Sequence, residues 1–163
     1  MTLTGNPDFE TKASYSFTVL ASDGVNAATE KAVTLAIINK DEVAPTVTSA
    51  TTASAINENL GSGQVVYTAT ATDSQDISAG VTFSLKAGQD AASFSIDSST
   101  GAVTLTGNPD FETKDSYSFT VVATDAAGNA SEKTVSLAIN NRDESAPSIS
   151  SSCLLYTSPS PRD

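Results

Sequence analysis

Hydrophobic and polar residues alternate with a period of two along most of the chain. In residues 117–124, aromatic and aliphatic side chains alternate with serine and threonine. Similar runs occupy residues 65–72, 81–86, 94–96, 103–105 and 135–139. A period of two is typical of half-buried β-strands, with one set of side chains in the core and the hydroxyls toward solvent. In the first of these runs we expect Val65, Tyr67, Ala69 and Ala71 to share the core face.

Turn residues separate the runs, for example Gly61-Ser62-Gly63 and Gly107-Asn108-Pro109. Residues 46–56 add a first, split strand, so that seven short strands are expected. The runs are rich in β-branched residues and show no helical stripe. The sequence therefore predicts an all-β, seven-stranded sandwich of the Greek-key, immunoglobulin-like kind. Its core should hold the aromatic side chains of Tyr67, Phe83, Phe94, Phe111, Tyr117 and Phe119.

An internal repeat organises the chain. The segment TLTGNPDFETK occurs at residues 2–12 and again at 104–114, an offset of 102 residues that persists without a gap to KDEVAP and RDESAP. About two-thirds of the aligned positions are identical. We expect residues 1–42 to be the last three strands of a truncated repeat, poorly stable alone, and residues 43–147 to be a complete repeat.

Both ends of the chain carry expectations of their own. Met1 aligns with Val103, in the middle of a strand of the second copy, as if a gene fragment began there. Residues 148–163 comprise the start of a linker and a tail that departs from the repeat. The segment CLLYTSPSPRD at 153–163 resembles translated sequencing adapter, although a native Ser/Pro linker is the alternative.

The composition narrows the chemistry. The 163 residues include 19 acidic and 8 basic residues, a net charge of −11, which disfavours nucleic-acid binding and anionic membranes. No apolar run is long enough for membrane insertion. There is no histidine and only one cysteine, so the sequence offers no histidine-based catalysis, zinc site or disulfide framework. An acidic surface of hard oxygen ligands remains, suited to calcium or magnesium.

The carboxylates gather at strand ends and loops. Glu58 follows the first strand, Asp73 and Asp76 follow the second, and Asp125 ends the sixth. Such groups repel one another unless a cation neutralises them, and calcium takes six to eight oxygen ligands. By contrast, Asp90, Asp97 and Asp115 are expected to be turn formers or solvated charges, with Asp97 capping the turn before Gly101. Lys114 and Glu132 are expected on a solvated face.

Several motifs carry a family resemblance. The segments INEN at 56–59, PDFE at 109–112, ATD at 123–125 and NRDESAP at 141–147 occur in the order of a cadherin repeat. The chain thus resembles cadherin repeats, of the kind found in large bacterial surface proteins. The resemblance covers residues 2–150 and implies calcium bound between consecutive repeats. The sequence departs from the family's pattern at DSQD, residues 73–76, and at the first and last positions of the linker.

The resemblance assigns ligands to two junctions. The junction between the two copies would use Asp8, Glu10, Asn39, Asp41, Glu42, Asp73, Asp76 and Asp125. A second junction, toward a further repeat, would use Glu58, Asp110, Glu112, Asn141, Asp143 and Glu144.

Together these features predict a non-catalytic, calcium-binding adhesion module of an exported repeat protein, in which Ca²⁺ stiffens the junction. We expect an extracellular, cell-surface location, anchored through other parts of the parent protein. The partners would be neighbouring repeats and, through other domains, surface proteins or polysaccharides. Two alternatives remain: a passive spacer in a secreted carbohydrate-active enzyme, and a calcium-independent immunoglobulin-like domain. Carboxylate pairs such as Asp110 and Glu112 are too close on one short loop for a glycosidase.

Overall fold

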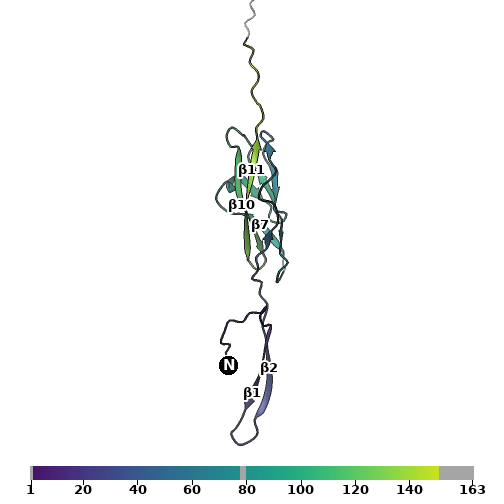
Figure 1. Cartoon of the computed structure of the whole chain (residues 1–163), viewed down its shortest axis with the longest axis vertical. Coiled ribbons are helices and arrows are strands. Elements are labelled where there is room, and N and C mark those ends of the chain that lie inside the picture. Colours follow the sequence, from purple (N-terminus) through teal and green to yellow (C-terminus); the bar gives the residue numbers. More distant parts are fainter. Residues whose placement is uncertain (1, 78–79, 151–163) are drawn as a thin grey trace, which may run out of the picture.

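Two packed β-sheets account for residues 43–147 (Figure 1). The computed structural model describes residues 2–77 and 80–150, so the expected adapter tail at 153–163 lies outside the described residues. One sheet has the order β4-β11-β10-β7: Ile56–Asn57, Ala130–Asn140, Ser116–Asp125 and Val81–Leu85. The other combines two pairings, β3-β6 (Thr46–Val47 and Ala71–Thr72) and β5-β9-β8 (Gln64–Thr68, Ala102–Leu105 and Phe94–Ile96).

This arrangement is the expected Greek-key sandwich of seven strands. Strands β5 and β6 are two halves of one strand, and β3 and β4 are the two halves of the split first strand. The halves of the first strand pair with different sheets: β3 lies antiparallel to β6, whereas β4 lies parallel to β11. Among the described residues, the only helical element is the short 3-10 turn η1 (Ala91–Ser93). None of their helices is long and apolar enough to cross a membrane.

The core lies between the sheets, and the aromatic prediction is confirmed. Tyr67, Phe83, Phe94 and Phe119 are buried, while Phe111 and Tyr117 pack against them partly buried. Phe119 is fully enclosed, with its ring centroid 4.6 Å from that of Phe94 and 5.9 Å from that of Tyr67. Such contacts add to the hydrophobic effect that holds the two sheets together.

The expected core face of residues 65–72 is wrong at its first position. Val65 is 61% exposed, and Val66 is buried in its place. The pairing of β5 with β9 shifts between Val65 and Tyr67, because a β-bulge lets two successive residues face the same side. A strict period of two therefore holds only from Tyr67 onward.

Gly101 is required where the two halves of the strand β5–β6 meet the turn before β9. Its φ is +72°, and a Cβ at this position would lie 2.3 Å from the carbonyl oxygen of Ala69. The close approach of the two backbones allows a hydrogen bond of 2.8 Å from the Ala69 N–H to the Gly101 carbonyl. Asp97 caps this turn as expected, since its Oδ1 accepts hydrogen bonds from the amides of Ser99 and Thr100.

The first copy forms a hairpin of β1 (Ser14–Ala21) and β2 (Thr29–Ala36), which extends away from the sandwich along the long axis of the molecule (Figure 1). Its register equals that of β10 and β11, offset by 102 residues: Phe17 pairs with Val33 as Phe119 pairs with Val135. Three strands were expected here, but residues 2–4 form none. Their counterpart β9 pairs with β5 and β8, and residues 2–42 contain no equivalent of either.

Candidate metal centres

Among the residues that the structure describes, three groups of acidic side chains converge. We call them the inner cluster (Asp41, Asp73 and Asp125), the outer cluster (Glu10, Glu42 and Asp76) and the distal cluster (Glu58, Asp110 and Glu112). In each, one carboxylate oxygen of every member lies within 4.8 Å of those of the others. The first two clusters lie where the hairpin joins the sandwich, and the distal cluster lies at the other end of the sandwich, where β11 ends.

The inner cluster combines three separate parts of the chain. Asp41 belongs to the linker between β2 and β3, Asp73 follows β6, and Asp125 ends β10. Asp41 and Asp125 are buried, at 5% and 6% exposure. Because strands of different sheets end at this edge of the sandwich, the fold itself forces these like charges together.

Unpartnered oxygens mark the inner cluster as a place for a cation. Both carboxylate oxygens of Asp73, Oδ2 of Asp41 and Oδ1 of neighbouring Asn39 are buried, and none has a hydrogen-bond partner among the residues that the structure describes. Buried oxygens of this kind normally find a donor, since leaving them unsatisfied is costly. A hard divalent cation would satisfy such a set of oxygen ligands.

The charge of Asp125 is held in place by its own turn. Burial alone would raise the pKa of its carboxyl. Hydrogen bonds from the Asn129 side chain and from the backbone N–H groups of Asn129 and Gly128 outweigh this effect, so the net pKa is lowered. The Asn129 side chain also donates a 3.0 Å bond to the Asp41 carbonyl. Asn129 therefore ties the linker to the end of β10.

The outer cluster is exposed and partly self-repelling. Asn39 Nδ2 donates a hydrogen bond of 2.7 Å to Oδ1 of Asp76, which links the outer cluster to the linker two residues before Asp41. The pKa of Glu10 is raised, because burial and the charges of Asp76 and Glu42 outweigh the bond from its own backbone N–H, the largest single effect. A nearby cation would relieve this repulsion.

The distal cluster is built around Glu58, which is 1% exposed. Its oxygens accept hydrogen bonds from the backbone N–H groups of Arg142 (2.6 Å) and Phe111 (2.8 Å), which lower its pKa. Asn141 Nδ2 donates to Oε1 of Glu112 at 2.8 Å. The pKa of Glu144 is raised by burial and by neighbouring Glu58, and its Oε1 accepts a bond from the Asn59 side chain.

The structure thus brings together nine of the residues expected as ligands, and Asn39, Asn141 and Glu144 bond to or beside them. Asp8 is not one of the nine; its carboxylate accepts hydrogen bonds from the amide and hydroxyl of Thr11, and its side chain also interacts with that of Glu10 in the outer cluster. Asp143 accepts a bond from the Ser145 N–H instead of joining the distal cluster. Sequence reasoning missed Asn129, whose place four residues after Asp125 at a predicted turn was the available signal.

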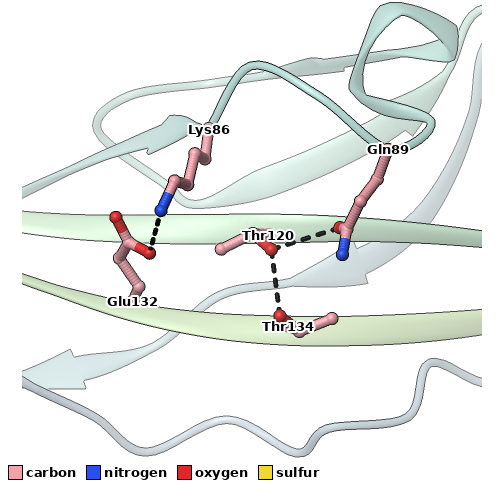
Figure 2. Close-up of polar contacts among 5 residues, drawn as sticks. All are labelled: Lys86, Gln89, Thr120, Glu132 and Thr134. Carbon is pink, nitrogen blue, oxygen red and sulfur yellow. Dashed lines mark hydrogen bonds and ion pairs between the residues drawn. The ribbon is translucent and has the colours of Figure 1, made fainter.

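A further polar hollow of about 290 Å³ lies on the solvent face of β10 and β11 (Figure 2). Lys86 forms an ion pair of 2.7 Å with Glu132, both about half exposed. The Thr120 hydroxyl donates to Gln89 Oε1 at 3.2 Å and lies 3.0 Å from the Thr134 hydroxyl. Glu132 is therefore on a solvated face as expected, and the polar groups that line the hollow bond to one another.

Comparisons with known proteins give a matching family model and several relatives. A family model described as Cadherin domain matches residues 52–140. Protocadherin Fat 4 of Mus musculus is 29% identical over 146 residues, covering 88% of this chain and 3% of that protein. Protocadherin gamma-B4 of Homo sapiens is 28% identical over 145 residues, covering 87% of this chain and 16% of that protein. The chain therefore spans only a small part of the length of these relatives. Both relatives are animal proteins, so they do not support the expected bacterial source.

Solved structures show the same fold. The crystal structure of human protocadherin-24 EC1-2 superposes with a TM-score of 0.60 at 22% identity, covering 86% of this chain and 72% of that one. Extracellular cadherin domains 1–4 of protocadherin gamma B7 give a TM-score of 0.58 at 20% identity, covering 83% of this chain and 34% of that one.

Proposed function

The chain belongs to the cadherin family, and on that premise we propose that it is a calcium-binding adhesion module whose two repeats are held in line by calcium at the inner and outer clusters. The observation that carries this proposal is Asp73: both of its carboxylate oxygens are buried beside Asp41 and Asp125, with no hydrogen-bond partner among the described residues. Calcium would supply the positive charge that such a site requires.

The chain's own residues explain why a junction of this kind would be stiff. Asp41 lies on the linker, whereas Asp73 and Asp125 lie on the sandwich, so a shared ligand ties one to the other. Asn129 and Asn39 already cross the junction through hydrogen bonds to the Asp41 carbonyl and to Asp76. Without a cation, the convergent carboxylates favour separation of the two parts.

The proposed location follows from the relatives. Protocadherin ectodomain structures contain tandem repeats like the two copies in this chain. We place the module at the cell surface, in an exported parent protein of the adhesion class, with neighbouring repeats as direct partners. Surface proteins or polysaccharides would bind through other domains of that parent. The role is structural and non-catalytic.

Calcium titration tests the proposal directly. Calorimetry should show binding heat, and EDTA should lower the melting temperature. Free calcium at about 100 times its dissociation constant would add about 2.7 kcal/mol to the free energy of unfolding. The double variant Asp41→Ala, Asp125→Ala should lose the effect. An EDTA-insensitive melt without calcium heat would favour the alternatives, a passive spacer or a calcium-independent immunoglobulin-like domain.

A further inference from the structure

Asn129 contacts two of the three inner-cluster residues through one side-chain amide. Its Nδ2 donates to Oδ2 of Asp125 at 2.9 Å and to the carbonyl of Asp41 at 3.0 Å. An amide nitrogen carries two hydrogens, so these two bonds use both of them. One side chain in the turn between β10 and β11 therefore holds the carboxylate at its own strand end together with the backbone of the linker.

The linker is held at two points around Asp41. Besides the bond from Asn129 to its carbonyl, Oδ1 of Asp41 accepts a hydrogen bond of 3.1 Å from the Val43 N–H. Oδ2 of Asp41 is buried and has no hydrogen-bond partner among the described residues. Because the carbonyl and Oδ1 are both tied down, the carboxylate has little freedom to turn away from the other two aspartates of the inner cluster.

The corresponding turn of the first copy shows that capping the aspartate does not require an asparagine at this position. The counterparts of Asp125 and Asn129 are Asp23 and Ala27. Asp23 is capped from one position earlier, since Asn26 donates to it through its N–H (2.8 Å) and its Nδ2 (2.7 Å). The position of Asn129 differs in that its amide also reaches the carbonyl of a distant segment.

This bridge opposes the charge repulsion at the junction. Asp41, Asp73 and Asp125 each offer a carboxylate oxygen, and these oxygens lie within 4.8 Å of one another. Without a cation the three charges repel, which favours movement of the linker away from the sandwich. Asn129 bonds to both sides and so resists that movement. Groups that hold metal ligands in place typically change metal affinity about 10- to 100-fold when they are removed.

We infer that Asn129 is a positioning residue of the junction: it fixes Asp41 beside the end of β10 before a cation binds, and so strengthens calcium binding at the inner cluster. This role rests on the proposed function and extends it to a residue that belongs to none of the three clusters. Asn129 acts on calcium through Asp41 and Asp125, because its amide nitrogen faces their oxygens. Without it, the linker would have to be ordered at the moment of binding, which costs affinity.

Calorimetry of Asn129→Ala in the full chain tests this role. Alanine keeps the two backbone bonds between residue 129 and Asp125 and removes only the side-chain bonds. We expect a calcium dissociation constant at least about tenfold weaker, with the number of bound ions unchanged. Asn26→Ala is the matched control, because it removes an asparagine cap from the corresponding turn without touching the linker. Its dissociation constant should stay within about twofold of that of the unsubstituted chain.

Hydrogen exchange in EDTA gives a readout that needs no calcium. The Val43 N–H, which is bonded to Asp41, should exchange faster in Asn129→Ala than in the unsubstituted chain. In Asn26→Ala its rate should not change. The amides in the middle of β10 and β11 should stay protected in both variants. Loss of their protection in Asn129→Ala would mean that Asn129 holds the sandwich itself together, which would overturn the positioning role.

The remaining outcomes separate this inference from the proposed function. Calcium heat with an unchanged dissociation constant in Asn129→Ala, or an unchanged exchange rate of the Val43 N–H, would overturn the positioning role and leave calcium binding intact. Equal weakening in Asn129→Ala and Asn26→Ala would also overturn it, because capping of the turns would then explain the effect. Absence of calcium heat from the unsubstituted chain would remove the proposed function and this inference with it.

Discussion

Glu58 accepts a hydrogen bond of 2.6 Å from the backbone N–H of Arg142, 84 residues further along the chain. Its other oxygen accepts from the Phe111 N–H, so one carboxylate joins the split first strand to the turn before β10 and to the end of β11. These bonds favour the charged form, as the lowered pKa of Glu58 shows. Glu58 thus has a structural role at the distal cluster that does not depend on any cation.

Glu58→Gln should therefore lower the melting temperature even in EDTA. The glutamine amide can accept only one of the two backbone bonds and presents an N–H group to the other donor. Glu144→Gln is the matched control of opposite sign: burial and the charge of Glu58 raise the pKa of Glu144, so removing its charge should leave the melting temperature unchanged or higher. Equal losses in the two variants would contradict this assignment.

Phe17 and Phe119 occupy the same position of the same SYSFTV segment, but only Phe119 is fully buried. Phe119→Ala should cost about 3–5 kcal/mol of the free energy of unfolding, the usual range for a buried phenylalanine. Phe17→Ala should cost less than about 1 kcal/mol, because no second sheet formed by residues 2–77 and 80–150 covers the β1–β2 hairpin. Urea unfolding of both variants measures the difference, and similar costs would show that the hairpin face is covered.

The sequence pattern predicted the sandwich because strand alternation reflects burial directly, and the seven runs all became strands or half-strands. It placed Val65 wrongly because a bulge moves one residue to the other face without changing composition. It also expected a third strand in residues 1–42. Alternation shows that residues 2–4 could form a strand. Their counterpart β9 pairs with β5 and β8, and residues 2–42 contain no equivalent of these two strands.

The site was predictable to the extent that strand ends meet at one edge. Asp41, Asp73 and Asp125 follow from that rule and from the order of the motifs. The hydrogen bond from the Thr11 hydroxyl to the Asp8 carboxylate was not predicted, because an Asp-x-x-Thr turn forms through local contacts that the order of the motifs does not reveal. Asn129 was missed because an asparagine in a turn is usually a turn former, and only the fold places it beside Asp41.

Lys133 joins the two sheets near the start of the second copy. Its Nζ donates to the carbonyl of Val47 (2.7 Å), the last residue of β3, and to that of Ser49 (2.8 Å). Lys133→Met should destabilise the chain by about 1–2 kcal/mol, because both carbonyls lose a charged donor. The control is Lys31→Met at the corresponding exposed position of the first copy, where the free energy should change by less than about 0.5 kcal/mol.

Asp97 should make stability depend on pH. The Ser99 hydroxyl and the Thr100 and Ser99 amides bond to its carboxylate and hold its pKa well below the ordinary value. A lowered folded pKa stabilises the protein above the unfolded value, near 4, and the contribution is lost as the pH falls further. Urea unfolding of Asp97→Ala in EDTA should show a deficit at pH 7 that shrinks toward pH 2.

The control for this pH effect is Asp97→Asn, which keeps the oxygen acceptor at the turn but cannot titrate. It should retain part of the stability at pH 7 and show less change with pH than the unsubstituted chain. A deficit in Asp97→Ala of constant size from pH 7 to pH 2 would contradict an electrostatic role for the carboxylate.

Asp73→Asn should reverse its effect when calcium is added. In EDTA the substitution removes one of three convergent charges, together with a buried carboxylate that lacks a hydrogen-bond partner among the described residues, so the melting temperature should rise. In calcium the variant should melt below the unsubstituted chain, because one charged ligand is gone. Asp115→Asn, which neutralises an acidic residue outside all three clusters, should show no such reversal. A loss of stability in both conditions would mean that Asp73 has a purely structural role, and with it the inner cluster would lose its case as a calcium site.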